Sequence, residues 1–327
     1  MKIIIRCYLE NVSGIGQHIW HLAHQLERLG HQVKFDSMSN WSWLPDYFVE
    51  RIAAYGEQGQ VIQVCGLWEP CPPGAIYWAQ WEADQLCEEY VANLNGARMV
   101  ITSCEFAKQA FLRSGVIVPI EVIPLGVDLE EFHPIIEPGE ECRFGVIANM
   151  ISGRRKNIEG VIDAFRTAFH GDEVHLQLKI NIQDRIPPIS DVGISVVKGM
   201  FSTEHLRWWY NSLTCLVSGA LGEGFGLCPL QAMACGRPFI GVLEHGHREY
   251  CDETTGYPVT YTTQACPWYF NGGNMMVPDI PSMAAAMRQV YEDRQTAIEK
   301  GKASLERAKE FTWEIMGARV DKVLMSL

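Results

Sequence analysis

The segment SGALGEGFGLCPLQAMACGRPFIG, residues 218–241, leads from a short apolar stretch through a glycine-rich turn into an apolar helix. Gly222, Gly224 and Gly226 allow the backbone to turn tightly and to approach a ligand closely. A helix that begins near Leu227 presents free amides and the positive end of its dipole to an anion. The segment therefore favours a phosphate-binding turn with Glu223 at its mouth, although a glycine turn before an ordinary core helix has the same pattern.

Strands and helices alternate on both sides of this segment, as they do in a parallel sheet with helices on its faces. In the second half we expect strands at 143–150, 174–180, 193–197, 214–218 and 238–242, and helices at 157–169, 203–211 and 227–235. The region 281–327 reads as helical with a break near Phe311.

The first half starts with the same pattern. Residues 2–8 read as a buried strand, a loop with Gly14 and Gly16 follows, and apolar positions recur at helical spacing from Gln17 to Leu29. Further strands are expected at 32–36, 61–65, 75–79 and 98–103, and helices at 84–95 and 105–113.

The acidic, proline-containing stretch 133–142 reads as a linker that follows the outward-running segment 121–127. The predicted fold is α/β, with two Rossmann-like doubly wound domains at 1–138 and 139–310. Ligands bind at the carboxyl ends of parallel strands, so the expected site is a cleft where the two sets of strand ends face each other.

Composition and charge narrow the classes of function. Of the 327 residues, 47% are hydrophobic and 20% are charged, as in a globular protein with a substantial core. Residues 1–140 hold 8 Lys and Arg against 18 Asp and Glu, whereas residues 141–327 hold 19 against 21. An acidic first half disfavours nucleic acid and anionic lipid as partners, since both attract basic patches.

The cysteines and apolar runs point to a cytoplasmic protein. The 11 cysteines form no C-x-x-C pair and no Cys/His cluster with zinc-ligand spacing, and this scattered use suits a reducing compartment. Arg6 and Glu10 interrupt the first apolar run too early for a signal peptide. No apolar run approaches the roughly 20 residues that span a bilayer.

The stretch EGFGLCPLQAMACGRPFI resembles the donor-site motif of the retaining GT-B glycosyltransferases of family 4, in which two glutamates stand eight positions apart. The likeness extends from about residue 1 to 320. It includes SGIGQHIWHLAHQLERLGHQV (13–33), the run from SCEFAK to GVDLEEFHP (103–134), SGRRKN (152–157), MVPDIPSMAAAMRQVYEDR (276–294) and EFTWE (310–314). The resemblance also implies that the helix at 311–327 packs back on the first domain.

This resemblance implies roles at the donor end of the site. Arg155 and Lys156 would compensate the charge of a nucleotide diphosphate and stabilise it as it leaves, Arg through a planar fork and Lys as a point charge. Arg154 is either a third cation or a solvated residue. Glu223 would position donor-sugar hydroxyls. The other implied donor-site residues are Gly14, Gly16, Gly224, Phe225, Gly226 and Leu227.

Gln231 departs from the family motif. The second glutamate of the motif would accept hydrogen bonds from the two ribose hydroxyls. A glutamine keeps one acceptor oxygen and adds two N–H donors, so it would hold a diol more weakly than a carboxylate. This substitution points either to altered donor affinity or to a protein that binds nucleotide sugars without catalysis.

The acceptor side has weaker signals. Trp81 and Glu82 resemble a Trp-Glu pair of some short family members, in which the carboxylate would orient an acceptor hydroxyl, although a structural role is equally consistent. Trp41 lies in an expected loop and could stack on a sugar ring. His18, His245 and His247 flank glycine-rich turns and are interpreted as satisfied or exposed imidazoles rather than catalytic groups.

The function implied is transfer of a sugar, with retention, from a nucleotide diphosphate sugar to a hydroxyl acceptor. The resemblance implies no metal and no cofactor beyond the nucleotide-sugar co-substrate. Two alternatives stay open. A nucleotide-sugar epimerase with this fold would turn over the donor without any acceptor, and a non-catalytic binding protein would bind the donor without turnover.

Overall fold

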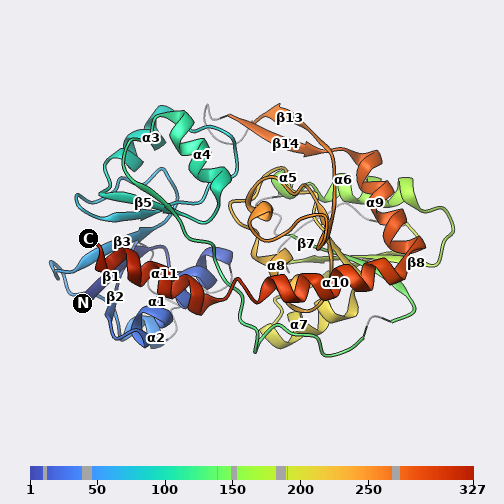
Figure 1. Cartoon of the computed structure of the whole chain (residues 1–327), viewed down its shortest axis with the longest axis horizontal. Helices are drawn as coiled ribbons and strands as arrows, with labels where there is room; N and C mark the ends of the chain where they lie inside the picture. The colour runs from blue at the N-terminus through green and yellow to red at the C-terminus, as the bar shows by residue number, and fades with distance from the viewer. Residues whose placement is uncertain are drawn as a thin grey trace. The chain divides into compact units, whose positions relative to one another are not determined.

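The computed structural model describes residues 1–9, 13–38, 46–137, 139–148, 153–181, 189, 191–266 and 273–327. The chain forms two compact units (Figure 1). Unit 1 comprises Met1–Gly126, Cys266–Gly273 and Thr312–Leu327, and unit 2 comprises Val127–Ala265 and Asn274–Phe311.

In unit 1 the described residues form a six-stranded sheet in the order β2-β1-β3-β4-β5-β6, and every strand pair is parallel. From β1 the chain adds β2 on one side of the sheet and then β3 to β6 on the other side. The switch point of the sheet therefore lies between β1 and β3. The strands are β1 Lys2–Cys7, β2 Gln32–Ser37, β3 Gln60–Val64, β4 Ile76–Trp78, β5 Met99–Thr102 and β6 Ile120–Val122.

The helices of unit 1 cover this sheet. They are α1 Gly14–Arg28, α2 Asp46–Val49, α3 Glu88–Asn95, α4 Glu105–Ser114 and α11 Trp313–Met325. The expected loop at Gly14 and Gly16 is wrong, because both glycines lie in the first turn of α1. Ser13 caps this helix by accepting a hydrogen bond from the Gly16 amide, which allows the helix to begin before Gln17.

In unit 2 the described residues form a second six-stranded parallel sheet, in the order β12-β11-β10-β7-β8-β9. Counted along the chain, this is the Rossmann order, with the switch point between β7 and β10. The strands are β7 Cys142–Ala148, β8 Val174–Ile180, β9 Ile194–Lys198, β10 Cys215–Val217, β11 Phe239–Gly241 and β12 Gly256–Pro258. The predicted α/β class with two Rossmann-like doubly wound sheets is confirmed.

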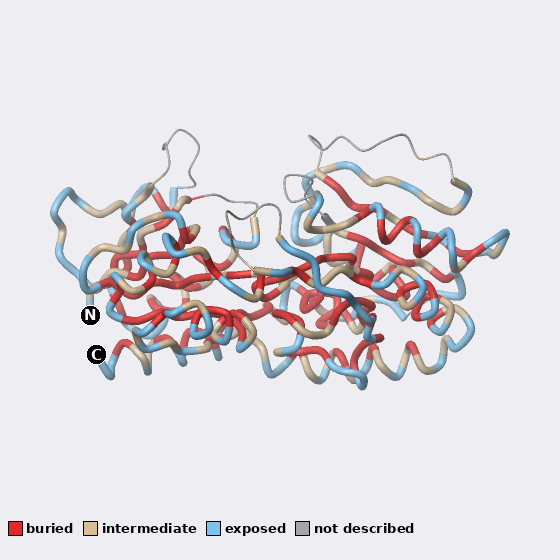
Figure 2. Tube along the Cα trace, turned by 90° about the horizontal axis from the view of Figure 1, so that it is seen from above, coloured by how far each residue is buried: buried red, intermediate tan, exposed pale blue. Residues whose placement is uncertain are grey.

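Helices and an antiparallel hairpin complete unit 2. The helices are α5 Gly153–Lys156, α6 Ile158–Ala168, α7 Thr203–Ser212, α8 Leu227–Ala234, the 3-10 helix η2 Gly246–Glu249, α9 Ile280–Glu292 and α10 Arg294–Ala308. The hairpin of β13 Tyr261–Ala265 and β14 Asn274–Pro278 was not predicted. Figure 2 shows buried segments running through the interior of each unit, with exposed segments around them.

The chain passes from unit 1 to unit 2 at Gly126–Val127, earlier than the boundary expected between 138 and 139. The reason is that residues after Val127 contact unit 2. The Phe132 ring packs against Tyr210, and the Ile135 amide donates to Asn211 at 2.8 Å. The acidic stretch 133–142 therefore begins on the surface of unit 2 and is not a free linker.

The last helix, α11, packs against α1 within unit 1. The Trp313 ring stacks on His21 with ring centroids 4.3 Å apart, and Asp321 lies 2.7 Å from the Nε2 of His31. Gly317 faces Gln25 so closely that a Cβ atom there would lie 2.4 Å from the Gln25 Cβ. Among the helices of the described ranges, none is long and apolar enough to cross a membrane.

Substituting Gly317→Ala tests this helix contact. The added methyl group has to push α11 away from α1, which costs about 1–3 kcal/mol, while the helix gains up to about 1 kcal/mol in propensity. We expect a net loss of about 1–2 kcal/mol in the free energy of unfolding, measured by urea denaturation. Gly139→Ala is the control, because nothing lies within 4 Å of its Cβ position. Equal stabilities of the two variants would contradict the packing.

Candidate active site

The site forms at the switch point of the unit 2 sheet, where the chain leaves β7 and β10 at the same edge. The segment after β7 ends in the short helix α5, which carries Arg155 and Lys156. The turn after β10 carries Glu223. The two segments are joined by a backbone hydrogen bond from the Leu221 amide to the Arg155 carbonyl at 2.9 Å. Residues distant in sequence are thereby held together where α/β sheets bind ligands.

Glycine permits the close approach of these two segments. A Cβ atom at Gly219 would lie 2.6 Å from the Asn157 carbonyl oxygen. Asn157 has a left-handed backbone, with φ 49°, and its side chain accepts from the Gly160 amide at the start of α6. Asparagine tolerates this conformation better than most residues, so the turn that ends α5 suits its sequence.

The Glu223 carboxylate is paired with both cations. Its Oε1 accepts a hydrogen bond from the Lys156 Nζ and lies 3.2 Å from the Arg155 Nη1. The same Arg155 nitrogen donates to the Gly222 carbonyl at 2.6 Å. Glu223 is only 8% exposed, so the ion pair is largely shielded from water. The structure therefore brings together the three residues to which sequence analysis gave catalytic roles.

The charge state of Glu223 follows from these contacts. Burial alone would raise its pKa, but the nearby charges of Lys156 and Arg155, with a contribution from His247, hold the pKa well below its usual range. Glu223 is therefore ionised at neutral pH. One negative charge thus faces two positive charges, and a surplus of positive charge is left for an anionic ligand.

The turn before α8 has the geometry that sequence analysis expected. Gly226 is the N-cap of α8 with φ 89°, and a Cβ atom there would lie 2.8 Å from the His247 ring and 2.9 Å from the Tyr250 hydroxyl. The Tyr250 hydroxyl donates to the Gly226 carbonyl at 2.6 Å, and the Phe225 ring packs against Tyr250. Leu227 begins the helix, whose free amides and dipole favour an anion at this end.

His245 and His247 form a buried layer beneath this turn. Their rings meet edge to face at 4.5 Å, and the Gly246 amide between them donates to the Glu223 carbonyl at 2.9 Å. The Nδ1 of His247 donates to the Val242 carbonyl at 3.0 Å. Burial lowers the pKa of His247 to about 4, so the ring is uncharged at neutral pH. These contacts match a structural role, and Tyr250 is a supporting residue that sequence analysis missed.

Gln231 lies on α8 and is 4% exposed. Its Oε1 accepts a hydrogen bond from the Tyr210 hydroxyl at 3.1 Å, and burial raises the pKa of Tyr210 well above its usual value. The one acceptor oxygen of the side chain is therefore already hydrogen-bonded within unit 2. No sequence signal pointed to Tyr210 as its partner, because the two residues are 21 positions apart on different helices.

The remaining predicted donor residues lie in different parts of the chain. Arg154 is exposed on α5, in contrast to its half-buried neighbours Arg155 and Lys156. Gly224 is buried in the turn with Phe225. Gly14 and Gly16 belong to unit 1, in the first turn of α1.

The predicted acceptor-side residues lie in unit 1. Trp81 is 3% exposed, its indole N–H donates to the Gln85 carbonyl at 2.9 Å, and its ring packs against Tyr90. Trp81 is thus packed in the core of unit 1. Glu82 is half-buried next to it. Trp41 lies outside the described residues.

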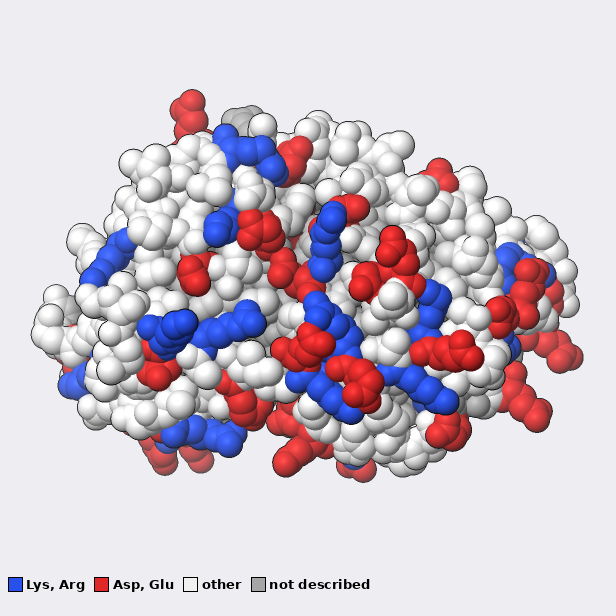
Figure 3. Space-filling view, viewed as in Figure 1, with Lys and Arg blue, Asp and Glu red and all other residues white. Residues whose placement is uncertain are grey.

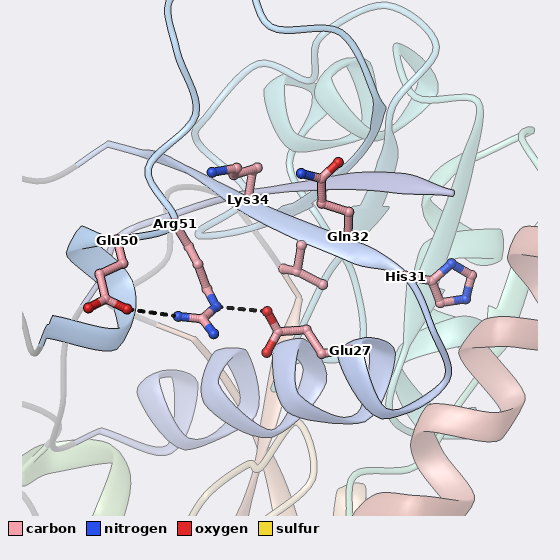
Figure 4. Close-up of a pocket in the computed structure, with 7 residues that line it drawn as sticks. Glu27, His31, Gln32, Lys34, Glu50 and Arg51 are labelled. Atoms are coloured by element: carbon pink, nitrogen blue, oxygen red, sulfur yellow. Dashed lines mark hydrogen bonds and ion pairs between the residues drawn. The ribbon is translucent and has the colours of Figure 1, made fainter.

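A shallow groove in unit 1 is remote from these residues (Figure 4). Arg51 pairs there with Glu27 at 2.7 Å and with Glu50 at 3.7 Å. The groove lies along the amino-terminal half of β2, whereas ligands of α/β sheets bind at carboxyl ends. Its lining residues are Glu27, His31, Gln32, Val33, Lys34, Glu50 and Arg51.

Two further features concern the surface charge and the side chains that could bind a metal ion. On the face drawn in Figure 3, basic and acidic side chains are interspersed and do not form one basic patch. Within the described ranges, no group of three or more His, Cys, Asp or Glu side chains is arranged to hold a metal ion.

The chain is similar to known glycosyltransferases in sequence and in fold. The sequence model of the family described as Glycosyl transferases group 1 matches residues 141–293, which lie in unit 2. A D-inositol 3-phosphate glycosyltransferase from Arthrobacter sp. (strain FB24) is 26% identical over 214 residues, 60% of this chain and 47% of the relative. The chain therefore spans about half the length of this relative.

A lipopolysaccharide core biosynthesis mannosyltransferase, LpcC from Rhizobium leguminosarum bv. viciae, is 28% identical over 145 residues, 36% of this chain and 38% of the relative.

Solved structures resemble the whole chain. Sucrose-phosphate synthase from Thermosynechococcus elongatus has a TM-score of 0.75 at 18% identity and covers 100% of this chain and 99% of its own. Anabaena HepE, solved in complex with UDP and glucose, has a TM-score of 0.71 at 13% identity, with 100% of both chains covered. The chain thus has the GT-B fold of two Rossmann-like units, and its residues 141–293 match the sequence model of the group 1 glycosyl transferases.

Proposed function

We propose that the protein transfers a sugar from a nucleotide diphosphate sugar to a hydroxyl acceptor, with retention at the anomeric carbon and without a metal ion. The observation that supports this most is the cluster of Arg155, Lys156 and Glu223 at the switch point of unit 2. This cluster lies in the part of the chain that matches the group 1 glycosyltransferases.

The diphosphate of the donor would take the place that the Glu223 carboxylate occupies on the two cations. Lys156 and Arg155 would then face the phosphate oxygens, and the amide groups at the start of α8 would add partial positive charge. Glu223, released from the cations, would accept hydrogen bonds from donor-sugar hydroxyls. Its carboxylate therefore has a second role, as a stand-in anion while the site holds no donor.

The proposed reaction uses this arrangement. The bond between the anomeric carbon and the phosphate oxygen breaks, and a bond from that carbon to the acceptor oxygen forms on the same face. The acceptor proton passes to the departing phosphate oxygen. Lys156 and Arg155 would stabilise the charge that builds up on the diphosphate, which is the role a metal ion has in other transferases. A positioned donor of this kind contributes about 3–4 kcal/mol in other enzymes.

UDP conjugates are the first donors to test. The HepE structure contains UDP and glucose, and related structures of the same protein contain UDP or UDP-glucose. GDP and ADP conjugates complete the panel. Gln231, the proposed ribose contact, is hydrogen-bonded to Tyr210 and does not single out one base.

The variants Lys156→Ala and Glu223→Gln test the positive and the negative charge of the site one at a time. Lys156→Ala removes a charge-assisted hydrogen bond, so we expect UDP to bind roughly ten- to hundredfold more weakly. Glu223→Gln removes the competing anion, so we expect UDP to bind at least as tightly as to the wild type, while sugar transfer falls. Isothermal titration with UDP, which lacks the sugar, measures the affinities.

Lys302→Ala, an exposed change elsewhere in unit 2, is the matched control and should bind UDP as the wild type does. The account is contradicted by weaker UDP binding in Glu223→Gln, or by unchanged binding in Lys156→Ala. If UDP, GDP and ADP all fail to bind folded wild-type protein, the donor site itself is refuted.

Metal independence and stereochemistry have a joint test. With UDP-glucose as donor, we expect UDP release to continue at an unchanged rate in excess EDTA, because two side-chain cations already face the diphosphate. Proton NMR of the first-formed product should show the anomeric configuration of the donor. Loss of activity in EDTA, restored by Mg²⁺ or Mn²⁺, would contradict the first expectation, and an inverted product would contradict the second.

A further inference from the structure

The Glu223 carboxylate is held by the same two cations that the diphosphate of the proposed donor would contact. Its Oε1 accepts a hydrogen bond from the Lys156 Nζ and lies 3.2 Å from the Arg155 Nη1. The side chains of Lys156 and Arg155 are 22% and 14% exposed, so both cations are shielded but can still be reached from the surface. An anion that enters the site therefore has to compete with Glu223 for them.

The backbone around Glu223 is fixed by hydrogen bonds. The Glu223 carbonyl accepts from the Gly246 amide at 2.9 Å. The neighbouring turn is held on two sides, because the Leu221 amide donates to the Arg155 carbonyl at 2.9 Å and the Leu221 carbonyl accepts from the Met276 amide of β14 at 2.8 Å. The carboxylate can therefore leave the two cations by rotation of the Glu223 side chain, without movement of the turn.

Charge decides which ligand can release the carboxylate. Burial raises the pKa of Glu223, but the charges of Lys156 and Arg155 outweigh it and hold the pKa well below its usual range, so the side chain is ionised. Removing one partner of a buried ion pair is strongly unfavourable, because it leaves the other charge unpaired in a medium of low dielectric constant. An uncharged sugar cannot replace the carboxylate on the cations, whereas a diphosphate can.

We propose that the pairing of Glu223 with Lys156 and Arg155 is a latch that makes binding of the donor sugar conditional on the diphosphate. While the cations hold the carboxylate, it is withheld from sugar hydroxyls. When a diphosphate takes the cations, the carboxylate becomes available to accept hydrogen bonds from the sugar. This inference rests on the proposed function, because it takes the two cations as the diphosphate site and Glu223 as the sugar contact.

The latch couples two parts of one ligand. Because binding free energies are linked, a diphosphate that raises the affinity for the sugar has its own affinity raised by the sugar by the same factor. A free sugar does not open the latch, so it does not compete with the nucleotide sugar for the site. The latch thus determines specificity for sugars that carry a diphosphate.

Saturation-transfer NMR on the full chain tests the latch with D-glucose, D-galactose, D-mannose and N-acetylglucosamine as probes. The dissociation constant of each probe is measured with and without saturating UDP, and the ratio of the two values is the coupling factor. In the wild type we expect at least one probe to bind about tenfold or more tightly when UDP is present.

Two variants open the latch in different ways. Lys156→Met keeps the length of the side chain and removes its charge. We expect about three- to tenfold tighter binding of the same probe without UDP, because Arg155 alone holds the carboxylate less firmly. Glu223→Gln removes the charge that the cations hold and keeps one acceptor oxygen. We expect its coupling factor to be at least about fivefold smaller than that of the wild type.

Lys302→Met is the matched control, because Lys302 is exposed elsewhere in unit 2. Its coupling factor and its affinity for UDP should equal those of the wild type. If Lys156→Met does not fold, Glu223→Gln alone carries the test, since it removes the same ion pair from the opposite side.

The latch is overturned if the probes bind the wild type equally well with and without UDP, or if no probe binds while UDP does. It is also overturned if the folded variants keep the coupling factor of the wild type. In each of these cases UDP still binds, so the donor site stands. Failure of UDP to bind folded wild-type protein would refute the donor site itself, and the latch with it.

Discussion

The candidate active site depends on one interaction, the pairing of the Glu223 carboxylate with Lys156 and Arg155. Lys156 and Glu223 are 67 positions apart in the sequence. They meet because the Rossmann order of unit 2 places the ends of β7 and β10 next to each other. Glycine at Gly219 and Gly226 allows the backbone segments to come close enough. The buried histidine layer supports the turn, and its lowered pKa values leave Lys156 and Arg155 as the cations of the cluster.

Unit 2 presents cations and a helix N-terminus at the carboxyl edge of its sheet, and these suit the diphosphate of the proposed donor.

Much of this fold was predictable from local patterns. The alternation of apolar strands and helices predicted both parallel sheets, and the glycine turn before α8 predicted a helix that begins near Leu227. Local patterns did not predict that α1 begins at Gly14, because the Ser13 cap outweighs the low helix propensity of two glycines. They also missed the hairpin of β13 and β14, whose polar, exposed first strand lacks an apolar face.

A crystal structure of the protein with UDP would test the central claim most directly. The account predicts diphosphate oxygens within hydrogen-bonding distance of Lys156 and Arg155, with the Glu223 carboxylate displaced from the Lys156 Nζ. The phosphates should also face the first amides of α8. A structure in which UDP binds elsewhere, with the Glu223–Lys156 pair intact, would contradict it.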